Sequence, residues 1–599
     1  DRYVEDGPEK WPKQLYEGSG GQWLLTIDEK KRILLNNIYG VDIDPQAVEV
    51  TKLSLLLKVL EGESEASLAT QLRMFQERAL PDLDNNIKTG NSLIGPDFYE
   101  DEQMMLLDEE EHYRINVFDW QAAFPQVFEG DSPGFDAVIG NPPYIRIQAL
   151  KEFAPVEVEH YKEAYRAAGK GNYDIYVVFV ERGLQLLNRN GRLGYILPHK
   201  FFKAKYGAPV RELISAGKHL SEVVHFGDEQ VFAGAMTYTA LLFLESASRE
   251  QFRFVKVPDL IAWRVSGEAA EGEVSTMNVT ADDWNFVIGS GADLFERLRQ
   301  MPVKLGDVAH IFVGLQTSAD KAYVLKGSGE PEDGLVNVRD WDGGEWSLER
   351  EAVKPFLNDV SVFGFERPES RHWLVFPYKL FGERAELVPA SEMSSSYPRT
   401  WEYLKSKEES LRRRESGKAD NERWYGYIYR KNLTSFEAPK LVVQVVSRIG
   451  RYAYDDTGIY FTGGGNGPYY GVRWSDSEDQ HSLHYLQGIL NSRLSDFYLH
   501  RISTTFRGGY WSYGKRFIEQ LPIRTIDFSD PEDVARYERM VEFVERMLAL
   551  HERLAEARIE RERTVIGHQI SATDRQIDRL VYELYGLTEE EIAIVEGNR

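Results

Sequence analysis

The segment FDAVIGNPPY, residues 135–144, places a side-chain amide directly after an apolar run. The run that ends in Val138, Ile139 and Gly140 predicts a buried strand, and Asn141 follows at its carboxyl end. Ligands of open α/β sheets bind at the carboxyl ends of the strands. We therefore expect the Asn141 amide at a binding edge.

Two prolines and an aromatic residue follow this amide. Pro142 and Pro143 stiffen the turn, and Tyr144 adds a ring. Because proline fixes its own φ and restricts the residue before it, the Asn141 oxygen and the Pro142 carbonyl are oriented before a ligand arrives. Such fixed acceptors can take the hydrogens of an exocyclic nucleobase amine, while Tyr144 stacks on a base that has left the duplex. These residues suit methylation of that amine, although Asn-Pro-Pro is also an ordinary turn after a strand.

The composition limits the chemistry. The 599 residues are 42% hydrophobic, enough for several domains. Without cysteine there is no disulfide, no thiolate metal site and no thiol nucleophile, so cytosine C5 methylation through a cysteine adduct is excluded. We predict no metal site. No apolar run approaches the roughly 20 residues that span a bilayer, and the start is acidic and polar, so we expect a cytoplasmic protein without a membrane partner.

The net charge of −25 argues against tight non-specific binding of nucleic acid, which usually leaves a basic footprint. Local basic clusters nevertheless exist, and each taken alone is also typical of a solvated face. They are Lys200, Lys203 and Lys205; Arg412 to Arg414; Arg430 and Lys431; and Arg501, Arg507, Lys515 and Arg516.

Two earlier segments suit a nucleotide-like cofactor. Asp42 ends a predicted strand, 37–43, where an acid can accept both hydroxyls of a ribose. The alternative role, capping the helix that follows, suits Asp44 better. Asn91 and Ser92 follow a short strand and a glycine, a plausible position against the adenine of a cofactor, although Gly-Asn-Ser is also a common turn.

Helices and strands alternate after the motif. We predict a helix over 173–188, a strand over 194–197 and a helix over 207–217. Strands near 223–226 and 237–244 then resemble a terminal antiparallel hairpin. The fold class is therefore α/β, with a mostly parallel sheet covered on both faces.

Four regions are expected along the chain. Residues 1–249 form the first α/β domain and 250–300 a connector rich in acids and small residues. Residues 301–528 form a β-rich α+β module with dense aromatics, with short β-prone runs at 310–313, 372–376 and 441–446. Residues 529–599 form a C-terminal helical segment, with a long charged helix over 533–563 and a second near 571–585.

These residues meet a known family. The chain resembles the amino-group DNA methyltransferases of the gamma class, and more narrowly the large Eco57I-like restriction-modification enzymes. The resemblance rests on YGVDIDPQAVEVTKLSLLL at 39–57, GNSLIG at 90–95 and NPPY at 141–144, and on the segments 173–201 and 231–244. The stretches HYLQGILNSRLSDFY at 484–498 and FRGGYWSYGKRFIEQLPI at 506–523 resemble the target-recognition domain of the TaqI-like branch.

The resemblance implies a Rossmann-like class I methyltransferase sheet that binds S-adenosylmethionine, and a module that binds double-stranded DNA. An aspartate is usual where this chain has Asn91. The implied site residues are Asn141, Pro142, Pro143 and Tyr144 for catalysis; Asp42, Ile43, Asn91 and Ser92 for the cofactor; Phe232 against the flipped base; and Arg507, Tyr510, Trp511 and Lys515 on DNA.

One family motif is absent. The first cofactor loop, which resembles DPACGSG, is not found, and GSGG at 18–21 lies too near Asp42, with no strand before it. We therefore expect a further domain or subunit to supply that loop. There is also no convincing PD…(D/E)xK nuclease pattern, so a nuclease, and Mg²⁺ with it, would belong to an upstream segment.

The leading hypothesis is an adenine-N6 DNA methyltransferase of a restriction-modification or phage-defence system, acting by base flipping. One alternative is a bifunctional enzyme with an upstream nuclease. Another is a DNA-recognition subunit without catalysis, which the absent loop motivates and the intact NPPY opposes. A cytosine-N4 acceptor also remains open, because both amines suit the same acceptors.

Overall fold

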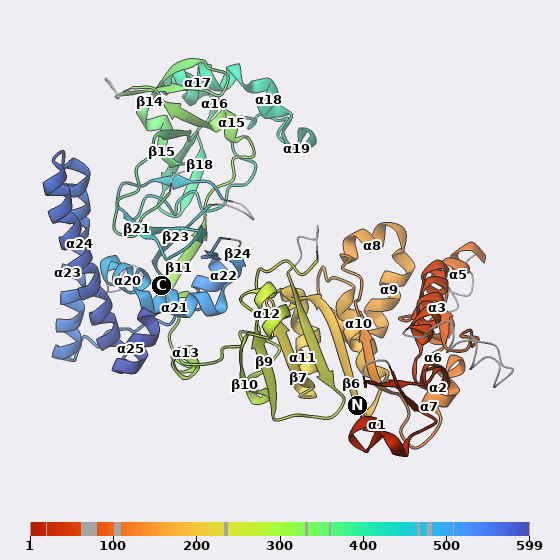
Figure 1. The fold of residues 1–599 in the computed structure, drawn as a ribbon. Coiled ribbons are helices and arrows are strands. Elements are labelled where there is room, and N and C mark those ends of the chain that lie inside the picture. The colour runs from red at the N-terminus through yellow and green to blue at the C-terminus, as the bar shows by residue number, and fades with distance from the viewer. Residues whose placement is uncertain are drawn as a thin grey trace. The chain divides into compact units, whose positions relative to one another are not determined.

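The computed structural model describes residues 2–18, 21–61, 81–100, 109–232, 238–329, 334–358, 361–463, 468–475, 482–506 and 508–597. By their contacts the residues form two compact units, Asp1–Phe286 and Val287–Arg599 (Figure 1). Within the described ranges, no helix is both long and apolar enough to cross a membrane.

A six-stranded sheet is the centre of the first unit. The neighbours β5 and β6 are parallel, as are β7 and β9, but β8 is antiparallel to both β6 and β7, and β10 to β9. The sheet is therefore mixed, and the prediction of a mostly parallel sheet is confirmed only in part: β5, β6, β7 and β9 run in one direction, whereas β8 and β10 run against it. The order is β10 (Ala270–Ser275), β9 (Gln251–Lys256), β7 (Leu220–His225), β8 (Thr239–Glu245), β6 (Leu187–Pro198) and β5 (Phe135–Gly140).

The region 250–300 differs from the expected connector. Its first part supplies β9 and β10, which extend the sheet beyond β7, and α12 (Leu260–Ser266) joins them. The antiparallel pairing of β7 with β8 is confirmed, but this pair is not terminal. Alternate residues of β9 are apolar and buried, including Phe252 and Phe254, so the segment behaves as a half-buried strand rather than a linker.

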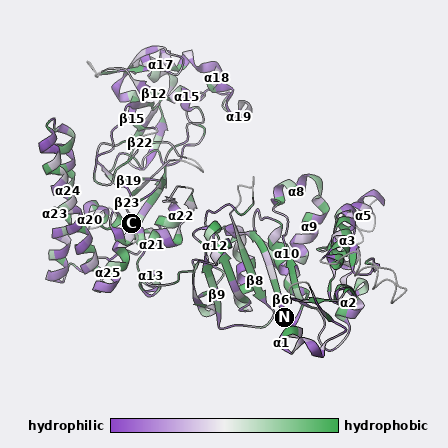
Figure 2. Cartoon of the chain, in the orientation of Figure 1, coloured by the Kyte–Doolittle hydropathy of each residue, from purple (hydrophilic) through white to green (hydrophobic). Residues whose placement is uncertain are grey.

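Alternating burial explains the sheet. Ala240, Leu242 and Leu244 of β8 are fully buried on one face, at a spacing of two residues. Figure 2 shows β8 as a largely hydrophobic strand. The helices α10 (Tyr176–Gln185) and α11 (Ala208–Ala216) contact each other, and α10 packs on β6 (Figure 1).

A second, two-stranded parallel sheet pairs β3 (Gly40–Asp42) with β4 (Ile87–Thr89). A small core that includes Val48 and Ile87 holds it against α2 (Ile27–Asn37) and α3 (Pro45–Leu60). The remaining elements of this unit are α1 (Arg2–Glu5), β1 (Leu15–Glu17), β2 (Trp23–Leu25), α5 (Glu109–Ile115), α6 (Trp120–Ala123), α7 (Pro125–Phe128), α8 (Ile147–Phe153) and α9 (Pro155–Ala164).

The second unit is built from several small sheets. One has the antiparallel order β11 (Ala309–Val313), β23 (Tyr469–Trp474), β19 (Lys440–Gln444) and β21 (Tyr452–Asp455). Another has the order β14 (Glu345–Glu349), β13 (Leu335–Arg339), β12 (Val324–Gly327), β16 (His372–Val375), β15 (Val353–Leu357) and β22 (Tyr460–Phe461). Smaller sheets pair β17 (Tyr378–Phe381) with β18 (Arg384–Leu387), and β20 (Val446–Ser447), β25 (Tyr510–Ser512) and β24 (Thr505–Phe506).

Helices complete this unit. They include α13 (Ala292–Arg299), α16 (Ala390–Ser396), α17 (Pro398–Ser406), α18 (Glu408–Arg412), α20 (Leu483–Leu490), α21 (Arg493–Ile502) and α22 (Lys515–Ile518), with short turns α14 (Leu305–Val308), α15 (Asp320–Tyr323) and α19 (Arg414–Gly417). The long helix predicted over 533–563 ends earlier, so that α23 (Pro531–Glu556) and α24 (Glu560–Leu584) form a hairpin followed by α25 (Glu589–Glu596).

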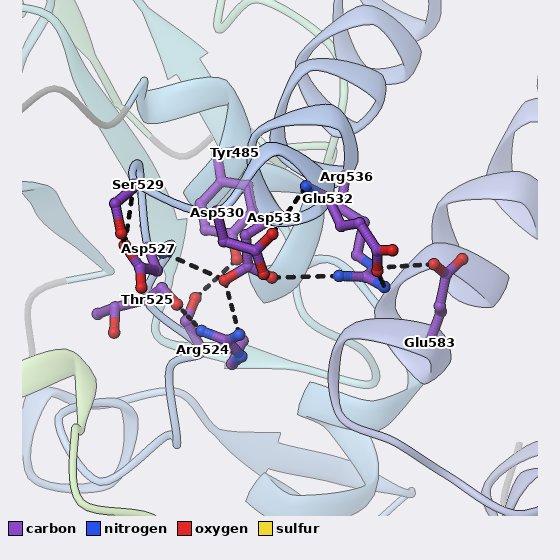
Figure 3. A network of polar contacts seen from close by, with 10 residues as sticks. All are labelled: Tyr485, Arg524, Thr525, Asp527, Ser529, Asp530, Glu532, Asp533, Arg536 and Glu583. Carbon is purple, nitrogen blue, oxygen red and sulfur yellow. Dashed lines mark hydrogen bonds and ion pairs between the residues drawn. The ribbon is translucent and has the colours of Figure 1, made fainter.

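The helical hairpin shares its core with the sheets. Met540 and Val544 of α23 are buried in the same cluster as Leu441 of β19. A polar network near the start of α23 adds to this contact (Figure 3). There the Asp533 carboxylate accepts hydrogen bonds from the Arg524 guanidinium at 2.7 Å and the Asp527 N–H at 3.1 Å. The C-terminal helices therefore belong to the second unit.

Candidate active site

The NPPY loop follows β5 and is held on the segment that precedes α10. The Ile147 N–H donates to the Tyr173 carbonyl, and the Ile175 N–H donates to the Ile145 carbonyl, both at 2.9 Å. These bonds form a short antiparallel bridge on either side of Arg146 and Asp174. The loop is thus fixed at both ends, by the strand before it and by this bridge after it.

Tyr144 holds the amide of Asn141. Its single hydroxyl hydrogen is shared between the Asn141 side-chain oxygen at 2.8 Å, the nearer acceptor, and the Ile196 carbonyl of β6 at 3.3 Å. Burial raises the pKa of Tyr144 to about 12, so the hydroxyl remains a neutral donor. An amide oxygen has two lone pairs, and one remains for a ligand. Tyr144 therefore orients the acceptor as well as presenting a ring.

A chain of buried polar groups supports Tyr144. Its ring meets the edge of Tyr176 at 6.4 Å between centroids. The hydroxyls of Tyr176 and Tyr206 are 2.7 Å apart, and Tyr206 donates to the Asp174 carboxylate at 2.8 Å. Sequence reasoning missed Asp174 and Tyr206 as site residues, because they meet Tyr144 only through contacts distant in sequence.

The strand before the motif differs from the prediction. Ile139 was expected to be buried, but it is 86% exposed. The reason is that β5 lies at the end of the six-stranded sheet and pairs with β6 alone. Pro142 is buried and Pro143 exposed, and no hydrogen bond reaches the Pro142 carbonyl from the part of the chain that is described. That carbonyl is available as an acceptor.

The two segments predicted to bind the cofactor lie side by side. Asp42 at the end of β3 is opposite Thr89 at the end of β4, and the Gly90 N–H donates to the Asp42 carbonyl at 2.9 Å. One Asp42 carboxylate oxygen accepts from the Asp44 N–H at 2.9 Å, and the other has no partner in the described ranges. Asp44 caps α3 through the Gln46 N–H at 2.8 Å, as predicted. The neighbouring Ile43 is exposed.

Asn91 and Ser92 have roles within the fold. The Asn91 side-chain oxygen accepts from the Leu93 N–H at 3.1 Å, and the backbone N–H of Asn91 donates to the Asn116 carbonyl at 2.7 Å. The Ser92 carbonyl accepts from the Trp120 indole at 3.0 Å and from Arg182 at 3.3 Å. Asn91 is buried. These contacts fix the turn beside Asp42, which leaves the exposed Asp42 carboxylate as the more accessible of the polar groups.

Phe232 is partly exposed and lies at the end of a described range, since 233–237 fall outside it. Among the described residues no ring contact joins Phe232 to Tyr144. Its predicted place against a flipped base stays a prediction.

Three of the four predicted DNA contacts lie within the described residues, and their surroundings differ. Arg507 lies outside the described residues. Tyr510 is exposed, with the Arg448 guanidinium 5.1 Å from its ring centroid. Trp511 instead stacks on His500 at 4.4 Å, with the rings 9° from parallel. The Lys515 ammonium donates to the Ile311 carbonyl at 3.1 Å and keeps two further hydrogens.

The described residues form no recognisable metal-binding cluster. In the described portions of the chain, no three His, Cys, Asp or Glu side chains gather as they would around a metal ion.

Comparison with known proteins matches a family model to part of each unit. Residues 36–232 match the Eco57I restriction-modification methylase family, and residues 395–523 match the TaqI-like C-terminal specificity domain. Two relatives are the type II restriction enzyme and methyltransferase RM.Eco57I of Escherichia coli, 29% identical over all of this chain and 58% of its own length, and the type II methyltransferase M.PaeR7I of Pseudomonas aeruginosa, 25% identical over 78% of this chain and 72% of its own.

The fold has a solved counterpart. The type IIL restriction-modification enzyme MmeI, solved in complex with DNA, matches with a TM-score of 0.55 at 13% identity, over 96% of this chain and 67% of its own length. Compared with RM.Eco57I, the chain spans 58% of that protein's length, little more than half.

Proposed function

We propose that this chain, which belongs to the Eco57I family of restriction-modification methylases and carries a TaqI-like specificity domain, is the catalytic and recognition part of a site-specific DNA methyltransferase. The observation that carries the proposal is the Asn141 oxygen, held by Tyr144 at the carboxyl end of β5 beside the Pro142 carbonyl, which accepts no hydrogen bond from the described residues. Two such acceptors fit the two hydrogens of an exocyclic amine.

The mechanism follows from these acceptors. The Asn141 oxygen and the Pro142 carbonyl accept the amine hydrogens, so the nitrogen lone pair is drawn out of conjugation with the ring. Tyr144 orients Asn141 and stacks on the everted base, and Phe232 covers its other face. S-adenosylmethionine, when bound, supplies the methyl group: the N–C bond forms as the sulfonium C–S bond breaks, and the amine releases a proton. We propose adenine N6 as the acceptor, with cytosine N4 as the alternative.

The residues present fit the nucleoside half of that cofactor. The exposed Asp42 carboxylate, with one oxygen unpaired within the described residues, suits the ribose hydroxyls. Asn91, Ser92 and Ile43 lie around it on the same edge. Asn91 would contribute by shaping the adenine pocket, because its side-chain oxygen already accepts a backbone N–H.

The methionine half needs a further element. We propose that a strand and its glycine-rich loop, from another domain or subunit, lie between β3 and β5. Among the described residues each of these strands pairs with a single strand, and Ile139 of β5 is 86% exposed. The rings of Tyr39, just before β3, and Phe135, at the start of β5, have centroids 6.0 Å apart, so the two strands start within side-chain reach of each other. A parallel strand there would pair with both edges and cover Ile139.

The test is transfer of label from tritiated S-adenosylmethionine to DNA by the full-length protein, followed by nucleoside analysis. Label in N6-methyladenine supports the main proposal, and label in N4-methylcytosine alone assigns the alternative acceptor. Asn141→Ala abolishes transfer and leaves DNA binding intact. The matched control is Asn190→Ala, an exposed asparagine near the start of β6, which keeps wild-type turnover. Unchanged turnover in Asn141→Ala removes that residue from the mechanism.

A bifunctional enzyme is the second candidate. The relative RM.Eco57I is named as both restriction enzyme and methyltransferase, and this chain covers 58% of it. Such an enzyme would carry a nuclease outside the present sequence and would require Mg²⁺ for cleavage. Cleavage of unmethylated DNA by the full-length protein, dependent on Mg²⁺ and retained in Asn141→Ala, is the distinguishing result. A recognition subunit without catalysis would instead show no label in any variant.

A further inference from the structure

The three-stranded sheet of β20, β25 and β24 presents one unpartnered face. In its register Phe506 is opposite Tyr510, and Trp511 is opposite both Ser447 and Thr505. Since successive side chains of a strand alternate between faces, Phe506 and Tyr510 share one face and Trp511 lies on the other. Arg448, one residue after Ser447, returns to the face of Tyr510, and its guanidinium lies 5.1 Å from that ring.

The two faces have opposite environments. On the first, Phe506 is 40% exposed, Tyr510 39% and Val446 40%. On the second, Ser447 is buried and Trp511 stacks on His500. The inward face thus anchors the sheet to α21, while the outward face leaves two rings and an apolar side chain uncovered. Exposed aromatic pairs of this kind are typical of a binding surface rather than of a monomer surface.

One cation, Arg448, lies on the outward face, and Lys515 follows the end of β25 by three residues. In a chain of net charge −25, the residues described contain no carboxylate paired with Arg448, Arg473 or Lys515. Arg473 lies opposite His310 in the register of β23 with β11, and the Lys515 ammonium donates to the carbonyl of the next residue, Ile311. Burial lowers the pKa of His310, and Arg473 and Lys515 lower it further, which is consistent with the two cations being close together.

We infer that the outward face of β20, β25 and β24, with Phe506, Tyr510 and Arg448, is a contact surface for duplex DNA, flanked by Lys515 and Arg473 as phosphate ligands. The inference rests on the proposed function and identifies which residues of the specificity domain contact DNA. Flat rings pack on sugars and base edges, and guanidinium and ammonium groups neutralise phosphates. An acidic partner is favoured because no carboxylate of the described residues pairs with these cations. Trp511, predicted from the sequence as a contact, is replaced by Phe506 and Arg448.

The experiment measures binding of fluorescein-labelled, mixed-sequence duplex DNA to the full-length protein over a series of salt concentrations. The double variant Phe506→Ala/Tyr510→Ala raises Kd roughly tenfold or more. Arg448→Gln lowers the slope of log K against log salt by about one. Trp511→Phe keeps the ring on His500 and binds like the wild type. Phe381→Ala is the matched control, because Phe381 is also an exposed aromatic, 57% accessible, on a small sheet of the same unit.

Each outcome decides the inference. Wild-type affinity in the double variant overturns it and leaves the proposed methyl transfer standing, since that is measured separately through Asn141. Unchanged DNA binding together with an altered oligomeric state in sedimentation assigns the face to a protein partner and also overturns it. A wild-type protein that binds no duplex overturns both. Because Phe506 and Tyr510 are about 40% exposed and Trp511 packs on His500, unchanged thermal unfolding is required to verify that the variants are folded.

Discussion

Tyr144→Phe separates the two roles assigned to Tyr144. The substitution removes the hydroxyl that donates to Asn141 at 2.8 Å and to Ile196 at 3.3 Å, and leaves the ring beside Tyr176. A neutral hydrogen bond contributes about 1 kcal/mol. If that amount is lost from the orientation of Asn141 in the transition state, kcat falls about fivefold. Tyr144→Ala also removes stacking on the base, about 1–3 kcal/mol, and lowers the rate by roughly a further tenfold or more.

The assay is single-turnover methyl transfer from tritiated S-adenosylmethionine, paired with 2-aminopurine fluorescence as a measure of base flipping. Tyr144→Phe flips the base normally and transfers slowly, whereas Tyr144→Ala is impaired in both. Because the pKa of Tyr144 is raised to about 12, the ratio of wild-type to Tyr144→Phe rates stays constant across neutral and mildly alkaline pH. Tyr39→Phe, which removes an exposed hydroxyl bonded to a backbone carbonyl, is the control.

Two results refute this reasoning. A wild-type rate in Tyr144→Phe shows that Asn141 needs no orienting donor. A rate as low as that of Asn141→Ala shows that the hydroxyl does more than orient the amide. The purely orienting role assigned to the hydroxyl is then wrong.

Three further predictions concern the rest of the chain. Asp42→Ala raises the Kd of S-adenosylmethionine about 10–100-fold in calorimetry, because hydrogen bonds from the ribose to a charged acceptor are lost. The control Asp44→Ala costs about 1 kcal/mol of stability at the α3 cap and leaves this Kd unchanged. Equal Kd values for the two variants would exclude Asp42 from the site. Gly90→Ala lowers stability by about 1–3 kcal/mol in denaturant unfolding, because a Cβ there would lie 2.4 Å from the Phe118 ring, and a neutral effect would show that Phe118 can move. Burial raises the pKa of Asp533, but hydrogen bonds from the Asp527 N–H and from Arg524 and Arg536 outweigh burial and leave the pKa below its ordinary value. The stabilisation from the ionised carboxylate is therefore present above about pH 4 and is lost as pH falls. Asp533→Asn costs about 2 kcal/mol of stability at neutral pH and less in acid, and a pH-independent cost would contradict the lowered pKa.

Local pattern determined much of the architecture. The strand before Asn141, the short strand before Gly90 and the cap at Asp44 were all predictable, because each depends on a few neighbouring residues and on backbone preferences that act within one turn. The same holds for the antiparallel pairing of β7 with β8, since the two strands are close in sequence. The side-chain types around 141–144 likewise indicated an acceptor for an amine without any tertiary information.

Strand order, exposure and side-chain partners were decided only by the tertiary structure. Ile139 has the composition of a core residue, but its burial depends on whether a strand lies beyond β5. Tyr510 and Trp511 are adjacent and similar in sequence, and only the register of β25 sends one outward and the other onto His500. The bond from Tyr144 to Ile196 joins residues 52 positions apart. The amino-acid sequence determines what each side chain can do. Long-range packing determines which partner it meets, because the free energy of such contacts depends on the whole sheet rather than on neighbouring residues.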